Sequence, residues 1–160
     1  MVWFCFNRRR FRRFVLELMV NKTILTDSGF WLGLVDTSDQ FHTQSTVIAD
    51  LIENYNIIIP WPCLYETLST YLARRRSQLV LLEELISRPN ISLFDDKDYK
   101  DEALRQVLKL NRQAGYTYSL TDGVIREILK DIDVRLHYLV TFNQKDFIDI
   151  CVQRQIEIIE

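Results

Sequence analysis

Residues 56–60 have the sequence NIIIP, and this short segment indicates the class of fold. Isoleucines in an unbroken run, bounded by residues that interrupt regular structure, are the pattern of a strand buried on both faces. Such strands are typical of parallel sheets that are covered by helices on each side. We therefore expect an α/β protein whose sheet is largely parallel.

Predicted strands and helices alternate on either side of this segment. The predicted strands are residues 23–26, 56–60, 91–94, 137–141 and 155–159. The predicted helices are residues 30–35, 43–54, a hairpin that begins near 62 and continues over 77–87, then 98–113, 122–130 and 145–153. This alternation predicts a three-layer α/β/α, Rossmann-like fold with a mostly parallel central sheet of about four to five strands.

Apolar spacing also predicts which side of two helices is buried. In the first helix of the hairpin, one stripe continues to the arginine run 74–76 and consists of Leu64, Leu68, Tyr71 and Leu72. In the helix over 98–113, the residues expected inside are Ala103, Leu104, Val107, Leu108 and Leu110. Ser119 or Thr121 is expected to cap the helix over 122–130.

The composition is that of one folded domain. The chain has 160 residues, of which 48% are hydrophobic and 26% charged, with few glycines and prolines. That length and apolar content are sufficient for a proper core. Residues 1–22 carry a net charge of +5, whereas residues 23–160 carry −7 from 14 basic and 21 acidic residues. A negatively charged body does not suit a protein that coats nucleic acid by neutralising phosphates, but it suits a site that concentrates metal cations.

Residues 1–22 differ from the rest and are treated as a basic, aromatic N-terminal extension, expected to be disordered, before a domain over 23–160. Met19 begins the sequence MVNKTILTDSGF, which resembles the natural opening of a domain. The extension is therefore interpreted as an adventitious tail. An arm that contacts RNA and a short helix packed on a partner are the alternatives.

Three cysteines, widely spaced and in no CxxC pair, argue against a disulfide framework or a zinc site, so a reducing cytoplasm is the expected location. No apolar run approaches the ~18 residues that span a bilayer. We therefore expect no association with a membrane.

Acidic and amide side chains follow several of the predicted strands. Asp27 comes directly after the first strand, Glu66 lies in the helix after the second, and Asp122 begins a later helix. Asn143 and Asp146 follow the strand over 137–141. Because ligands of open parallel sheets bind at the carboxyl ends of the strands, these side chains are expected at one edge. Clustered carboxylates repel one another unless a cation neutralises them, and their hard oxygens suit Mg²⁺ or Mn²⁺.

Each acid also has a purely structural interpretation. Asp27 before Ser28 and Gly29 is a common turn residue. Glu66 suits the positive end of a helix dipole, and Asp122 and Asp146 suit helix caps. Only their order along the chain and the sequences around them favour a functional site.

Four segments in order resemble the motifs of PIN-domain ribonucleases. They are ILTDSGFWLGLVDTSDQFH (24–42), IIIPWPCLYETLS (57–69), SLTDGVIREILKD (119–131) and HYLVTFNQKDF (137–147). In that family a strand ends in an Asp before a small-residue turn, a helix carries a Glu, and another helix begins with an Asp. The fourth motif has the form T-x-[DN]-x-x-[DE]-F. The resemblance covers residues 23–159 and implies a PIN-like fold.

The resemblance assigns Asp27, Glu66 and Asp122 to the three core acids that hold Mg²⁺ or Mn²⁺. Asn143 occupies the family's fourth position, with Asp146 three residues further on. An amide is a weaker metal ligand than a carboxylate, so this departure puts a second tightly held metal in question. All five residues are predicted as catalytic.

The function that the resemblance implies is metal-dependent endonucleolytic hydrolysis of RNA. The single-domain layout resembles VapC-like toxins of type II toxin–antitoxin pairs, which implies a small antitoxin partner and a homodimer. A housekeeping RNA-processing PIN nuclease would have the same residues. A catalytically weak PIN domain that acts as a binding module is the alternative from another class, and Asn143 is the feature that favours it.

Overall fold

The computed structural model describes residues 22–69, 71–113, 115 and 117–160. In that part of the chain five parallel strands form one sheet in the order β3-β2-β1-β4-β5. Their bounds are β1 (Thr23–Thr26), β2 (Asn56–Pro60), β3 (Ile91–Phe94), β4 (Tyr138–Val140) and β5 (Glu157–Ile159). The predicted α/β class and parallel sheet are confirmed.

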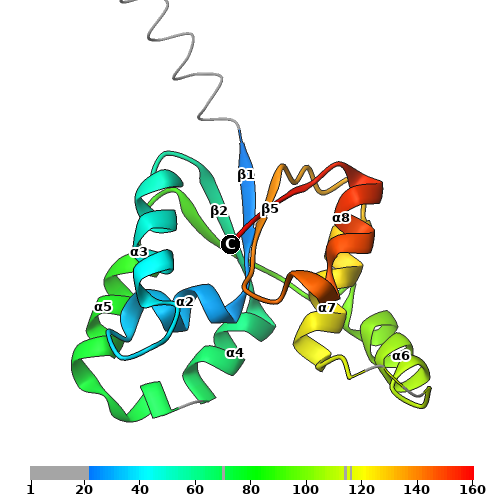
Figure 1. The fold of residues 1–160 in the computed structure, drawn as a ribbon, viewed down its shortest axis with the longest axis horizontal. Helices are drawn as coiled ribbons and strands as arrows, with labels where there is room; N and C mark the ends of the chain where they lie inside the picture. The colour runs from blue at the N-terminus through cyan, green and yellow to red at the C-terminus, as the bar shows by residue number, and fades with distance from the viewer. Residues whose placement is uncertain (1–21, 70, 114, 116) are drawn as a thin grey trace, which may run out of the picture.

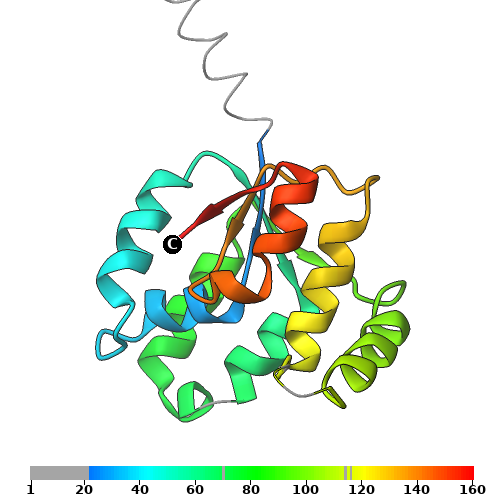
Figure 2. The same ribbon diagram turned by 45° about the vertical axis from the view of Figure 1, so that its right-hand side comes forward.

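Helices cover both faces of the sheet, as the three-layer prediction requires. They are α2 (Ser28–Val35), α3 (His42–Leu51), α4 (Trp61–Ser69), α5 (Arg76–Ile86), α6 (Lys100–Leu110), α7 (Leu120–Lys130) and α8 (Ile148–Arg154), with 3-10 helices η1 (Tyr71–Arg74) and η2 (Gln144–Asp146). Figure 1 shows α2, α3 and α5 on one flank and α6, α7 and α8 on the other, an arrangement that the turned view of Figure 2 keeps. At the lower edge, α4 contacts both α2 and α7 and so bridges the flanks.

The direction in which the chain winds reverses beside β1. From β1 the chain adds β2 and then β3 on one side, whereas β4 and β5 lie on the other side. Ile24 is therefore paired with Ile57 in one neighbour and with Tyr138 in the other. Such a switch point opens a crevice at the carboxyl ends of the strands. The β1–β4 pairing continues just past β1, where the Asp27 N–H donates to the Val140 carbonyl over 3.0 Å.

The central strands are buried on both faces. In β1, Ile24 and Leu25 are fully buried, and the isoleucines of β2 are at most 9% exposed. This matches the prediction made from NIIIP. Burial of successive residues rather than alternate ones is possible because helices from each flank cover the sheet. The core is continued by large buried side chains of α2 and α7, including Phe30, Trp31, Ile125, Ile128 and Leu129.

The stripe predicted along the first helix of the hairpin is wrong in part. Leu64 and Leu72 are buried, but Leu68 and Tyr71 are exposed. Within α4 the buried residues are Cys63, Leu64 and Thr67, so Leu68 lies outside the covered face. For Tyr71 the reason is that α4 ends at Ser69 and a separate 3-10 helix, η1, follows, so the helical spacing does not continue. The arginine run is divided accordingly: Arg74 ends η1, whereas Arg76 begins α5.

The burial predicted for the helix over 98–113 is also wrong in part. Ala103 is fully buried, whereas Leu104 and Leu108 are 45% and 52% exposed. The helix packs on the outer side of α7 rather than on the sheet, so only a narrow face is covered. That contact is close, because a Cβ added at Gly123 of α7 would lie 2.5 Å from Val107 Cγ2. Glycine at this position allows α6 to approach the start of α7.

The helix predicted over 145–153 is two elements. Gln144–Asp146 forms η2, and α8 begins at Ile148. Phe147 separates them with non-helical backbone angles (φ −129°, ψ −16°) and a fully buried side chain, and this interrupts the helical path. Asp146 therefore does not cap α8.

The N-terminal extension predicted over residues 1–22 lies outside the described residues, apart from Lys22. In the described part of the chain, none of the helices combines the length and the apolar character that a membrane crossing requires.

Asp36 ties the end of α2 to η1 and α5. Its carboxylate is buried and accepts hydrogen bonds from Ser38 (N–H 3.0 Å, hydroxyl 2.8 Å), from the Tyr71 hydroxyl and from Gln78 Nε2 (3.1 Å). Arg75 Nη1 lies 3.3 Å from the same carboxylate. These contacts, the Tyr71 hydrogen bond foremost, lower the pKa of Asp36 to about 2.

We expect Asp36→Asn to lower the free energy of unfolding at pH 7 by about 1–3 kcal/mol, because an amide cannot accept all of these bonds. A carboxyl with a lowered pKa stabilises the fold at pH above its unfolded value of 3.8, and this contribution is lost as the pH falls toward 2. Urea denaturation of both proteins between pH 3 and 7 measures the difference. Asp50→Asn, at an exposed site on α3, is the control and should change stability by less than about 0.5 kcal/mol. Equal stability of Asp36→Asn and wild type at pH 7 would contradict this account.

Candidate functional site

A cleft of about 330 Å³ opens at the carboxyl edge of the sheet. It lies at the switch point beside the end of β1, where α4 and α7 approach each other. The residues that line it come from five segments of the chain and are Asp27, Ser28, Gly29, Leu32, Phe41, Glu66, Ser119, Asp122, Phe142 and Asn143. Four of the five predicted site residues are therefore brought together, and Asp146 is not among the lining residues.

Asp27 is the most buried carboxylate of the cleft, with only 7% of its surface exposed. It is the N-cap of α2, and its Oδ1 accepts from the N–H of Ser28 at 2.6 Å and from the Ser28 hydroxyl at 3.2 Å. Its Oδ2 accepts from the Thr141 hydroxyl at 2.9 Å, across 114 residues of sequence. Both oxygens are therefore held, and the carboxylate has one orientation.

Burial is the main cause of the raised pKa of Asp27. It raises the pKa of this carboxyl from 3.8 to about 6, and the negative charges of Asp122 and Glu66 add to the rise. Hydrogen bonds from Thr141 and Ser28 oppose it without cancelling it. A buried carboxylate that two other acids disfavour is a group that a bound cation would stabilise.

Glu66 approaches Asp27 through a shared serine. The Ser28 hydroxyl lies 2.9 Å from Glu66 Oε2 and 3.2 Å from Asp27 Oδ1, so it contacts both carboxylates. Glu66 is in the middle of α4, with its side chain exposed to solvent. The helix-dipole interpretation is therefore weak for this residue, because dipole effects are confined to the first turn.

Asp122 is both a cap and a wall of the cleft. Ser119 is the N-cap of α7, and its hydroxyl accepts from the Asp122 N–H at 3.0 Å. The Asp122 Oδ2 in turn accepts from the Ser119 N–H at 3.0 Å, which completes a capping box. The interpretation of Asp122 as a capping residue is therefore confirmed. The cap also orients the carboxylate and is compatible with a role in the cleft.

Asn143 and Asp146 have different positions. The Asn143 N–H donates to the Thr141 hydroxyl at 3.0 Å, and this places its amide side chain at the cleft. Its Nδ2 donates to Asp146 Oδ2, so the Asp146 carboxylate contacts the amide from outside the lining. Asp146 is therefore in contact with a lining residue of the cleft without lining it.

Sequence patterns did not reveal the apolar wall of the cleft. Phe41 and Phe142 stack with ring centroids 4.2 Å apart, beside Leu32. Nothing in the local sequence of Phe41 predicts this contact, because the stack joins the start of α3 to the loop after β4. Thr141 and Ser119 were recognisable, the first from the family motif and the second from its position as a helix cap.

The fit to a divalent cation rests on the chemistry of the donors. Three carboxylates and an amide face one cleft, and these are the oxygen donors that Mg²⁺ and Mn²⁺ accept. Within the described residues, no three Asp, Glu, His or Cys side chains are arranged so that all could hold one ion. Mg²⁺ is commonly held by one or two carboxylates and several waters, so the donor set fits an ion bound partly through water.

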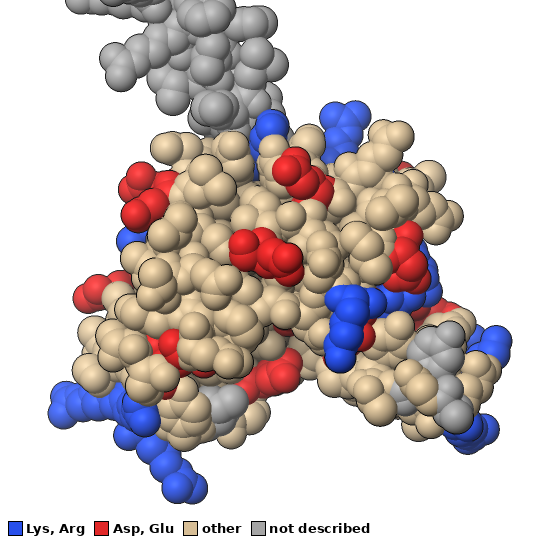
Figure 3. Space-filling model, in the orientation of Figure 1, with Lys and Arg blue, Asp and Glu red and all other residues tan. Residues whose placement is uncertain are grey.

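Acidic side chains lie in the hollow at this end of the molecule. Figure 3 shows them between the two flanks at the lower edge, while basic side chains lie beside the right-hand margin of the hollow and toward the lower corners. Neither histidine is among the residues that line the cleft. His42 Nδ1 lies 2.8 Å from the Gly33 carbonyl, and His137 Nδ1 accepts from the Thr23 N–H at 3.0 Å.

No protein-family model and no curated protein matches this chain. Among solved structures, it is similar to VapC20 of Mycobacterium tuberculosis, a toxin that cleaves the sarcin–ricin loop, with a TM-score of 0.62 and 16% identity over 79% of this chain and 94% of that one. It is also similar to VapBC2 of Rickettsia felis bound to a DNA fragment from their promoter, with a TM-score of 0.59 and 16% identity over 85% and 96%. At this identity the likeness establishes the fold, so the predicted PIN-like, VapC-type fold is confirmed.

We expect Asp27→Asn to stabilise the metal-free protein at pH 7.5. The raised pKa of Asp27 means that its charged form is disfavoured in the folded state, so stability declines as the pH rises from about 4 to 6. A neutral amide removes this cost, which is on the order of 1 kcal/mol after the lost hydrogen bonds are allowed for, and raises the melting temperature by a few degrees.

Thermal melts of both proteins with a chelator between pH 4 and 7.5 provide the measurement. The advantage of the variant should vanish near pH 4, where the Asp27 carboxyl of the wild type is protonated. A variant that is less stable by the same amount at every pH would refute the electrostatic cost. Asp50→Asn again serves as the control, and its effect should not depend on pH in this way.

Proposed function

We propose that this protein is a divalent-metal-dependent endoribonuclease that cleaves RNA at the acidic cleft. The observation that carries the proposal is the Asp27 carboxylate, buried at the switch point and held by Ser28 and Thr141, with Glu66 and Asp122 on the same cleft. Fold similarity to a toxin that cleaves RNA supports the same reading.

Asp27 and Asp122 are the residues that would hold Mg²⁺ or Mn²⁺, directly or through water. Such an ion lowers the pKa of a bound water and stabilises charge on the scissile phosphate. Asp27 is already oriented by hydroxyl and backbone donors, and Asp122 by its capping box. Little reorganisation of either carboxylate is then required on binding, which favours the bound state.

Glu66 completes the acidic set or positions a water. The Ser28 hydroxyl links it to Asp27, so both carboxylates face the same space. Neither histidine of the chain lines the cleft, so proton transfer from water is assigned to these carboxylates. Asn143 supplies a neutral oxygen donor at the fourth position.

The cleft suits single-stranded or looped RNA. The stacked pair Phe41 and Phe142 forms an apolar wall next to the carboxylates. Unpaired bases can be placed against aromatic side chains, whereas bases within a duplex cannot reach them. A negatively charged body gives little general attraction for phosphate, so contacts inside the cleft are assigned most of the binding.

The biological role we propose is that of the toxin of a type II toxin–antitoxin pair. The partner would be a small antitoxin that brings a cation, such as an arginine, to the exposed carboxylates of the cleft. A homodimer is part of the same proposal. A short reading frame beside this gene that encodes a DNA-binding protein, and relief of growth arrest when both are expressed together, would support this role over a housekeeping RNA-processing nuclease.

We expect Asp122→Asn and Asp27→Asn each to lower the turnover of a single-stranded RNA oligonucleotide by at least about 100-fold, because each loses a charge worth several kcal/mol to a bound cation. Cleavage of the labelled oligonucleotide with Mg²⁺ or Mn²⁺, and with a chelator, provides the measurement. Asp50→Asn on α3 is the matched control and should cleave like wild type. Metal-independent cleavage, or full activity of both variants, would eliminate the proposed site.

The identity of the fourth ligand makes a separate prediction. We expect Asn143→Asp to tighten Mn²⁺ binding by about tenfold, because a carboxylate adds charge where the amide has none. Calorimetric titration of wild type, Asn143→Asp and Asp146→Asn measures the affinities. If Asn143→Asp leaves the affinity unchanged while Asp146→Asn weakens it, Asp146 is the fourth ligand instead.

The second candidate function is a binding module without turnover. Two observations favour it: the amide at position 143 and the absence, among the described residues, of a complete three-residue metal group. Such a module would bind RNA or protein without Mn²⁺-dependent cleavage. The cleavage assay above separates the two candidates, because a binding module would leave the RNA oligonucleotide intact and give no cleavage products.

A further inference from the structure

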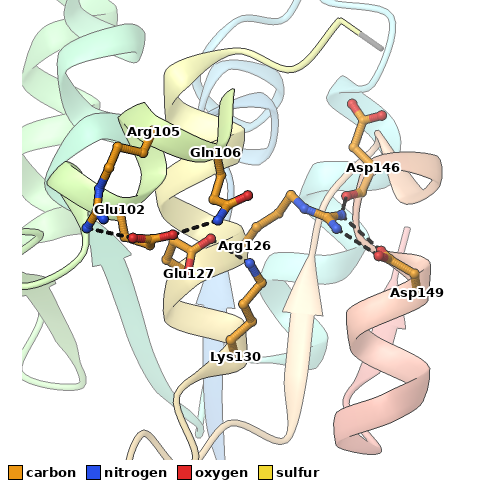
Figure 4. A network of polar contacts seen from close by, with 8 residues as sticks. All are labelled: Glu102, Arg105, Gln106, Arg126, Glu127, Lys130, Asp146 and Asp149. Carbon is orange, nitrogen blue, oxygen red and sulfur yellow. Dashed lines mark hydrogen bonds and ion pairs between the residues drawn. The ribbon is translucent and has the colours of Figure 1, made fainter. Parts of the chain in front are cut away.

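Arg126, on α7, joins three segments around the candidate site. Its Nη1 and Nη2 lie 2.9 and 2.7 Å from the two carboxylate oxygens of Asp149, at the start of α8. Its Nη1 also donates to the backbone carbonyl of Asp146 in η2. The guanidinium carbon lies 5.0 Å from the ring centroid of Tyr118, just before the N-cap of α7. Figure 4 shows the side chain reaching from α7 to the loop that carries Asp146.

One side of this arrangement leads to the amide of the cleft. Arg126 holds the main chain of Asp146, and the Asp146 carboxylate accepts from the Asn143 amide. In Figure 4 that carboxylate points away from the guanidinium, so Arg126 does not compete for it. Asn143 is held from its other side by the Thr141 hydroxyl, which also donates to Asp27. A chain of direct contacts therefore runs from Arg126 to the most buried carboxylate.

The other side leads to Asp122. Tyr118 contacts the guanidinium face and directly precedes Ser119, which forms the capping box with Asp122. Asn111, at the end of α6, holds the backbone of Tyr118 through a donated and an accepted hydrogen bond. Arg126 is four residues beyond Asp122 on the same helix. It thus contacts the segments that carry both Asp122 and Asn143.

The burial of Arg126 distinguishes it from the other ion pairs of this region. Its side chain is 13% exposed, whereas that of its partner Asp149, on another helix, is 61% exposed. Arg105 with Glu102 and Lys130 with Glu127 pair within one helix, at i,i+3 spacing, and their cations are far more exposed. Exposed pairs within a helix contribute little, whereas a guanidinium held in a planar fork fixes geometry.

We propose that Arg126 is a positioning residue of the site, which sets the distance between Asp122 on α7 and Asn143 in the loop after β4. The inference rests on the proposed function for its catalytic consequence alone. A planar guanidinium can bond Asp149 and the Asp146 carbonyl at once, whereas an ammonium group cannot reproduce both bonds in this geometry. A lysine at position 126, which keeps the positive charge but lacks the planar guanidinium, should therefore leave the fold intact. The alignment of Asp122 with Asn143 should be lost.

The experiment compares Arg126→Lys, Arg126→Ala and Asp149→Asn with Lys130→Ala in the full chain. Lys130→Ala is the matched control, because it removes a cation one turn further along α7 that contacts only Glu127 in this network. The readouts are melting temperature, Mn²⁺ affinity, kcat and KM for a single-stranded RNA, and amide exchange at Asn143. Arg126→Lys and Asp149→Asn keep the test decisive if Arg126→Ala does not fold.

We expect Arg126→Lys to melt within a few degrees of wild type but to lose about 10- to 100-fold in Mn²⁺ affinity or kcat, the range found for residues that orient metal ligands. KM should change little, and the backbone N–H of Asn143 should exchange its hydrogen with solvent faster. Lys130→Ala should leave every readout unchanged. Wild-type kcat, affinity and exchange in Arg126→Lys, or an equal loss in Lys130→Ala, would overturn the proposal.

The two proposals fail in different ways. If the wild-type protein does not cleave RNA, the proposed function fails, while exchange at Asn143 and Mn²⁺ affinity still test the role of Arg126. If the wild type cleaves RNA and Arg126→Lys behaves like it, only the positioning role is lost.

Discussion

The hydrogen bond from the Thr141 hydroxyl to the Asp27 carboxylate joins the ends of β1 and β4, the two strands between which the sheet changes its direction of winding. A carboxylate at this depth is costly unless donors surround it. The Ser28 N–H and hydroxyl occupy the other oxygen. The remaining cost is visible in the pKa of about 6, and it makes the cleft a place where a cation would be stabilised. The other features of the site are arranged around this group.

Helix capping and the lining of the cleft use the same carboxylates in this protein. Asp27 caps α2 and Asp122 closes the capping box of α7, so each carboxylate stabilises a helix terminus while it faces the cleft. The cap contact orients each carboxylate, and at Asp27 the Thr141 hydroxyl holds the second oxygen as well. The cap interpretation and the site interpretation of these acids are therefore complementary. The same is not true of Glu66, which lies away from either end of α4 and depends on the Ser28 hydroxyl.

Two arginines are paired with groups outside the lining of the acidic cleft. Arg126 is turned toward Asp149 and the Asp146 carbonyl, and Arg75 toward the buried Asp36. Neither guanidinium is a lining residue of the cleft, so the mutual repulsion of its carboxylates is not neutralised within it. Arg126 connects α7 to α8, and Arg75 contacts Asp36 at the end of α2. Both guanidinium groups are thus engaged outside the cleft.

The strand positions and the parallel sheet could be inferred from the amino-acid sequence because they depend on local properties, whereas the candidate acids were inferred from the order of four segments that resemble the motifs of a known family. Three isoleucines between breakers can be satisfied only where both faces are covered, and an Asp after a β-branched strand lies at the sheet edge wherever the chain goes next. Exposure of Leu104 and Leu108, the break at Phe147, the stack of Phe41 on Phe142 and the contacts of Arg126 could not be inferred. Each depends on which segment, distant in sequence, packs against the residue. Helical spacing identifies an apolar face, but only the neighbouring elements determine how much of that face is covered and which polar groups meet across it.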